Sequence, residues 1–120
     1  MKLWLDDVRP PWKHGCLGWV WAKTAEAAIE ILSTGHVVEA SLDHDLAWEH
    51  YPGAEQEPKP DNALKEKTGM AVIDFMEEHD IWPVDGVRVH SMNPVGRKRM
   101  VEALIRHYGG YPTDYVRLIL

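Results

Sequence analysis

Residues 37–45 read Val-Val-Glu-Ala-Ser-Leu-Asp-His-Asp. This short, mostly apolar run is typical of a buried β-strand, and it ends in two carboxylates with a histidine between them. The chain repeats the arrangement on either side of this stretch. Residues 3–5 (Leu-Trp-Leu) precede two aspartates, and residues 86–90 (Gly-Val-Arg-Val-His) precede a serine. Three predicted strands therefore end in polar side chains that suit a reactive site.

Helical patterns separate these strands. Three residues are good N-caps, and helically spaced apolar residues follow each of them: Thr24, Thr68 and Asn93. Two further strands are predicted at residues 18–22 and 116–120. The alternation of strands and helices predicts an α/β fold with a mostly parallel sheet of four or five strands. In such sheets, ligands bind outside the carboxyl ends of the strands.

The composition is that of an ordinary folded domain. The 120 residues are 45% hydrophobic and 27% charged, with a formal net charge of −6 at pH 7, and this size predicts one domain over residues 1–120. The negative charge argues against an extended nucleic-acid-binding face, because such a face is basic. A single cysteine excludes an intrachain disulfide, and no apolar segment is long enough to cross a membrane. We therefore expect a cytoplasmic protein, and whether it forms a homo-oligomer stays open.

One long segment interrupts the regular pattern. Residues 47–67 contain three prolines and many charges, and no helical or strand period runs through them. A connection of this length inside a small domain is usually a functional loop or a solvated insertion. Because the segment follows an acidic strand end directly, a lid over the site and a passive loop are equally good interpretations.

The clustered carboxylates suggest a cation. If Asp6, Asp7 and Asp43 meet at one edge of the sheet, their charges repel unless they take up protons or bind a metal. Oxygen ligands favour Mg²⁺ or Mn²⁺ over zinc. We predict these three residues as metal ligands. The alternative is that each is a solvated turn residue or a cap.

The histidines beside these acids are candidates for proton transfer, because the ordinary pKa of histidine lies near working pH. We predict His44, His90 and Asp45 as catalytic residues. A loop histidine bonded to its neighbour and a satisfied core histidine are the respective alternatives. Phosphate-binding candidates follow from the third helix, where Arg97 lies near an N-terminus that itself favours anions. Arginine side chains also bind phosphate through paired hydrogen bonds.

The motifs resemble the receiver domains of response regulators, which have an acid pair after the first strand and an aspartate after the third. No lysine ends a final strand here, and the segment between the first two strands is too short for a normal first helix. A closer resemblance is to the cyclic-phosphate-processing receiver-like domains. It covers most of the chain outside the 47–67 insertion and the tail. The motifs that carry it are Leu3-Trp4-Leu5-Asp6-Asp7-Val8-Arg9-Pro10, Trp19-Val20-Trp21, Ser41-Leu42-Asp43-His44-Asp45-Leu46, Thr68-Gly69 and His90-Ser91-Met92-Asn93-Pro94-Val95-Gly96.

This resemblance implies a small flavodoxin- or receiver-like sandwich, and the short segment between the first two strands predicts a reduced or missing first helix. It also implies a metal-dependent phosphoesterase that processes a cyclic phosphate, either at an RNA end, as in RNA repair, or in a cyclic nucleotide. In this hypothesis the acids hold Mg²⁺ or Mn²⁺. The phosphate oxygens are bound by Arg9, Ser91, Asn93 and Arg97. The alternative is a module that binds such a ligand without turnover, and a phosphoacceptor role for Asp43 is disfavoured by the missing lysine.

Overall fold

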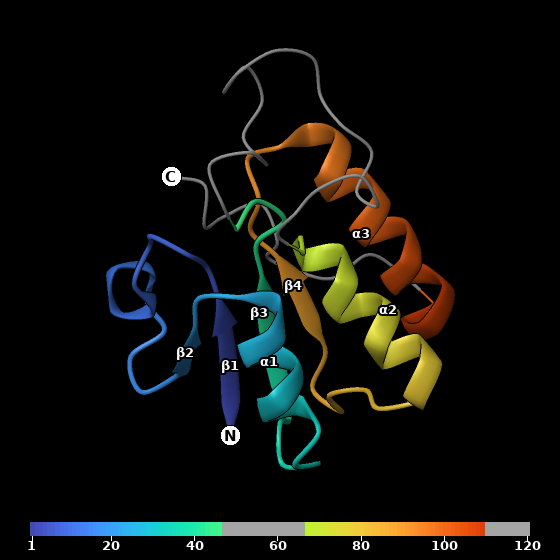
Figure 1. Cartoon of the computed structure of the whole chain (residues 1–120), viewed down its shortest axis with the longest axis horizontal. Helices are drawn as coiled ribbons and strands as arrows, with labels where there is room; N and C mark the ends of the chain where they lie inside the picture. The colour runs from blue at the N-terminus through green and yellow to red at the C-terminus, as the bar shows by residue number, and fades with distance from the viewer. Residues whose placement is uncertain (47–66, 110–120) are drawn as a thin grey trace.

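The computed structural model describes residues 1–46 and 67–109, which form a parallel β-sheet with helices packed on it (Figure 1). The strands pair in the order β2-β1-β3-β4, and all three pairings are parallel. Their bounds are β1 (Lys2–Leu5), β2 (Val20–Ala22), β3 (Glu39–Leu42) and β4 (Val87–Val89). The predicted α/β class is therefore confirmed. Two predicted segments lie outside the described residues. They are the insertion at 47–67, except for its last residue, and the strand at 116–120.

Each long helix begins at a cap that the sequence predicts. The bounds are α1 (Ala25–Leu32), α2 (Gly69–His79) and α3 (Pro94–Tyr108). The side chains of Thr24, Thr68 and Asn93 accept hydrogen bonds from the backbone at these helix starts. Helix α2 ends at His79, and Asp80 after it adopts the left-handed conformation with φ 52°. Within the described ranges, no helix is long and apolar enough to cross a membrane.

The connection between β1 and β2 contains only a short 3-10 helix, η1 (Pro11–His14). Proline has no backbone N–H and fixes φ, so Pro10 and Pro11 prevent a regular helix from continuing after β1. This agrees with the reduced first helix predicted from the short segment between the first two strands.

The two faces of the sheet differ in character. Alternate residues such as Leu3, Leu5 and Leu42 are buried in one core with the three α-helices, and Figure 1 shows α1, α2 and α3 side by side. Trp4 points to the opposite face, where it packs with Cys16. The loop that contains η1 covers this second face, and the His14 ring stacks on Trp4 with the centroids 5.5 Å apart.

The register explains where the site lies. Leu5 of β1 is paired with Leu42 of β3, which is paired with Val89 of β4. The next residue of each strand therefore falls in one row at the carboxyl edge of the sheet. Backbone hydrogen bonds continue the ladder into this row, from Asp43 N to Leu5 O and from His90 N to Leu42 O, both at 2.9 Å.

Candidate active site

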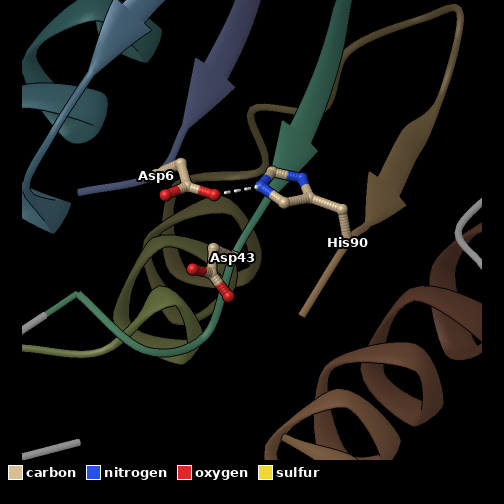
Figure 2. A group of neighbouring side chains, drawn as sticks. All are labelled: Asp6, Asp43 and His90. Atoms are coloured by element: carbon tan, nitrogen blue, oxygen red, sulfur yellow. Dashed lines mark hydrogen bonds and ion pairs between the residues drawn. The ribbon is translucent and has the colours of Figure 1, made fainter. Parts of the chain in front are cut away.

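Three side chains meet in this row. Asp6, Asp43 and His90 are each the first residue after a strand, and all three are buried. One potential ligand atom from each lies within 4.8 Å of the other two. Figure 2 shows the three side chains gathered at the ends of β1, β3 and β4. We call them the acid–histidine cluster.

Asp6 is the best-satisfied member of the cluster. Its Oδ1 accepts hydrogen bonds from the backbone N–H groups of Val8 at 2.9 Å and Arg9 at 2.8 Å. Its Oδ2 accepts one from Arg9 Nε at 2.8 Å and lies 3.0 Å from His90 Nε2. Burial raises the pKa of Asp6, but these hydrogen bonds and the charge of Arg9 together bring it below its ordinary value. Asp6 is therefore an ionised carboxylate.

Asp43 is much less well satisfied. Its Oδ2 forms an ion pair with Arg9 Nη2 at 3.2 Å, yet no donor in the described part of the chain reaches this buried oxygen with hydrogen-bond geometry. Burial raises the pKa of Asp43 to about 7, with further contributions from the charges of Asp6 and Asp45 that Arg9 only partly offsets. The site therefore carries more negative charge than its arginine neutralises.

His90 is neutral and is held at both ring nitrogens. Its Nδ1 lies 2.8 Å from Ser41 Oγ, and its Nε2 lies 3.0 Å from Asp6 Oδ2. Because an ionised carboxylate can only accept, the ring proton is on Nε2 and the Ser41 hydroxyl donates to Nδ1. Burial lowers the pKa of His90 to about 4 in spite of Asp6. The ring also stacks on Trp4 at a centroid distance of 4.0 Å, so its position is tightly fixed.

A second polar network lies at the start of α3. His44 Nδ1 is 2.9 Å from Asp45 Oδ1, and Asn93 Nδ2 donates to the same oxygen at 3.1 Å. On the other side of the ring, His44 Nε2 lies 3.5 Å from Arg99 Nη2. Since guanidinium nitrogens only donate, Nε2 is the acceptor and Nδ1 carries the proton toward Asp45. An imidazole oriented by a carboxylate in this way is suited to accept a proton at its other nitrogen.

Two glycines bring the helices close to the loop after β3. A Cβ atom on Gly96 would collide with the His44 ring, and one on Gly69 would collide with the backbone carbonyl of Asp43. The starts of α2 and α3 therefore pack directly against residues 43–45. This contact fixes the second network relative to the acid–histidine cluster.

Gly96→Ala should destabilise the protein by about 1–3 kcal/mol, because a methyl group inserted at a tight contact forces its neighbours to move. The affected neighbour is the His44 ring, so its NMR resonances should shift. Denaturant unfolding and histidine NMR measure the two effects. Lys98→Ala, an exposed change in the same helix, is the control and should alter neither. Unchanged stability and unchanged His44 resonances in Gly96→Ala would contradict this packing.

The remaining predicted site residues are placed less centrally. Asp7 is half-buried and is not a member of the acid–histidine cluster. The Ser91 hydroxyl accepts a hydrogen bond from Asn93 N at 3.1 Å, and Asn93 Oδ1 caps α3. Arg97 is half-buried, and its side chain makes no hydrogen bond or ion pair with the described residues. Of the four predicted phosphate ligands, Arg9 forms ion pairs with both carboxylates of the cluster, and a side-chain hydrogen bond from Ser91 acts to lower the pKa of Asp43.

Two residues of these networks were not among the predicted ones. Ser41 is a buried polar residue of β3, and the strand period places it on the same face as Trp4. That alternation was readable from the sequence. Arg99 approaches His44 because it lies three residues after Gly96, on the same side of α3. The helical period favours Arg99 over Arg97 once the His44–Gly96 contact is known, but the sequence does not show that contact.

Comparison with known proteins decides the family. A family model described as the cyclic-phosphate processing receiver domain matches residues 1–106. The chain belongs to this family. No curated protein and no solved structure matches the chain. The resemblance stated from the sequence is thus confirmed, and this cyclic-phosphate processing receiver domain has the parallel sheet and the acidic strand ends expected of it.

Proposed function

We propose that this receiver domain is a metal-dependent phosphoesterase that opens a cyclic phosphate, in a cyclic nucleotide or at an RNA end. The observation that carries the proposal is the acid–histidine cluster, whose potential ligand atoms lie within 4.8 Å of one another at the carboxyl edge of the sheet. The family description supplies the class of ligand.

The donor set of the cluster fits a hard divalent cation. The Asp43 carboxylate is buried, it has an oxygen without a hydrogen bond among the described residues, and its pKa is raised to about 7. A positive charge placed there would remove the cost of ionising it. Asp6 and Asp43 would hold Mg²⁺ or Mn²⁺, which prefer oxygen ligands. Such an ion supplies Lewis-acid polarisation of a phosphoryl oxygen and a more acidic bound water.

Arg9 is the phosphate-binding residue that the structure favours. Its guanidinium now contacts both Asp6 and Asp43. If a cation neutralised Asp43, the ion pair at 3.2 Å would no longer be required to balance the carboxylates. The Nη2 end of the guanidinium can then turn to a phosphate oxygen, while Nε keeps its hydrogen bond to Asp6.

His44 is the better candidate for proton transfer, because its Nε2 meets the exposed side chain of Arg99 at 3.5 Å, whereas His90 Nδ1 is held at 2.8 Å by the buried hydroxyl of Ser41. In hydrolysis, the oxygen of water forms a bond to phosphorus and one P–O ester bond of the ring breaks. The product is a phosphomonoester. His44 Nε2, with Nδ1 held by Asp45, would accept the proton of the water and pass it to the departing alkoxide oxygen.

A binding module without turnover is the second candidate. The observation in its favour is that Ser91 and Asn93, which the sequence assigns to phosphate, are engaged in the loop and the cap of α3. In that case Arg9 and a bound cation would hold the ligand, and no proton would be transferred.

The test is incubation with 2′,3′-cyclic AMP and with 3′,5′-cyclic AMP, in Mg²⁺, in Mn²⁺ and in EDTA, with chromatography of the phosphomonoester product. Metal-dependent turnover that Asp6→Asn abolishes supports the phosphoesterase. Asp85→Asn changes an exposed aspartate that precedes β4, at the other end of the sheet, and serves as the matched control. Binding without product would support the module. The absence of both binding and turnover would overturn both candidates.

A further inference from the structure

An exposed tryptophan lies close to the candidate site. Trp12 belongs to η1, in the loop that leaves β1, and 57% of it is accessible to solvent. Its ring packs against the ring of Trp21 in β2, at a centroid distance of 5.5 Å and an interplanar angle of 85°. Removing such a large apolar ring from water is favourable. An indole left open on a fixed support is therefore suited to receive a flat ligand.

Two indole hydrogen bonds fix this loop relative to the acid–histidine cluster. Trp21 Nε1 donates to the backbone carbonyl of Asp6 at 2.6 Å. Trp4 Nε1 donates to the backbone carbonyl of Arg9 at 2.7 Å. The segment that carries Asp6 and Arg9 is thus held by the indoles of Trp4 and Trp21. Trp21 therefore contacts both the ring of Trp12 and the backbone of Asp6.

Lys23 adds positive charge at the same place. Its ammonium group lies over the Trp21 ring, 4.4 Å from the centroid. The side chain is exposed, and the residue directly follows β2. An aromatic surface combined with a cation is the usual means by which proteins hold a nucleobase beside a phosphate without reading its identity.

We propose that Trp12, supported by Trp21 and Lys23, forms a subsite for the base of a nucleoside whose cyclic phosphate occupies the acid–histidine cluster. This inference rests on the proposed function and adds to it a binding site for the base of the ligand. The base stacks on the open face of Trp12, and the ribose spans the interval to the phosphate at Arg9. Stacking on an indole tolerates every base, so affinity should depend weakly on base identity.

The experiment compares two matched ligands by calorimetry, with and without Mg²⁺. One is 2′,3′-cyclic AMP, and the other is methyl riboside 2,3-cyclic phosphate, which has the same ring but no base. The intact protein should bind the nucleotide at least about 10-fold more tightly. Trp12→Ala should remove most of this preference without changing affinity for the base-free ligand. Trp12→Phe, which keeps an aromatic ring, should retain part of the preference.

Leu17→Ala is the control, because Leu17 is an apolar residue of the same loop, 85% exposed and without a ring. Melting temperatures of all variants verify folding. A trinucleotide with a 2′,3′-cyclic end distinguishes an RNA end from a free nucleotide, and a Trp12-dependent preference for either supports the subsite.

Equal affinity of the intact protein for the two matched ligands overturns the subsite and leaves the proposed function intact. An equal loss of both affinities in Trp12→Ala also overturns it, since the residue would then be structural. Binding of neither ligand overturns the subsite together with the proposed function.

Discussion

Asp43→Asn should raise the free energy of unfolding of the metal-free protein by about 1–3 kcal/mol at about pH 8. The ionised carboxylate is buried beside Asp6, and its raised pKa of about 7 means that the folded state resists its charge. Asparagine removes this charge at nearly equal volume. The loss of the ion pair with Arg9 offsets part of the gain, while Arg9 keeps its bonds to Asp6. Denaturant unfolding in EDTA measures the change.

The pH dependence of this effect has a definite sign. In the unfolded chain Asp43 titrates near its ordinary value of 3.8, and in the folded protein near 7. Between these values the folded state holds one more proton, so the stability contributed by the neutral group is complete below about 4 and is lost as pH rises through about 7. The advantage of Asp43→Asn should therefore be largest above pH 7 and should vanish near pH 4.

Metal addition gives the second half of the same test. Mg²⁺ or Mn²⁺ should raise the stability of the unmodified protein by mass action, by about 2.7 kcal/mol at one hundred times the dissociation constant. Asp43→Asn should lose this response, and Asp85→Asn should keep it. If Asp43→Asn lowers stability in EDTA and still responds to metal, Asp43 is a structural cap and not a metal ligand.

Much of this geometry was readable from the sequence. The acids and the histidine follow apolar runs directly, and carboxyl ends of parallel strands meet at one edge, so the meeting of Asp6, Asp43 and His90 required only the pattern and the pairing of the strands. The helix starts were readable for the same local reason, because a capping side chain acts within three residues of itself.

The partners within the site were not readable, because they depend on which side chains face each other across elements. His44 and His90 look alike as histidines beside strand ends. The structure separates them: His90 is enclosed by Trp4 and Ser41 on the face opposite the helices, whereas His44 faces α3 through Gly96. The sequence assigned proton transfer to both residues, and the geometry favours His44 for it.

His44→Ala should lower kcat for the cyclic substrate by about 10²-fold or more, the usual effect of removing a proton-transfer group. His44 is the histidine whose Nδ1 is held by Asp45 while Nε2 acts as an acceptor. Ligand affinity should change little, because Arg9 and the carboxylates remain. Free imidazole should restore part of the rate to His44→Ala, a response that a purely structural residue would not give.

His90→Ala is the matched comparison. It removes a fully buried ring that stacks on Trp4, and it takes one hydrogen-bond partner from Ser41 and one from Asp6. Its main effect should be a loss of about 2–5 kcal/mol in stability, as for other large-to-small changes in a core. The rate of the folded fraction should fall less than in His44→Ala, and imidazole should not restore it.

The two variants together separate the roles of the two histidines. A larger rate loss in His90→Ala than in His44→Ala, measured on folded protein at saturating substrate, would assign proton transfer to the acid–histidine cluster itself. If the unmodified protein and both variants bound the ligand equally well and none of them turned it over, the binding module would be the function. Only a rate loss in His44→Ala that imidazole partly reverses agrees with a proton accepted at His44 Nε2.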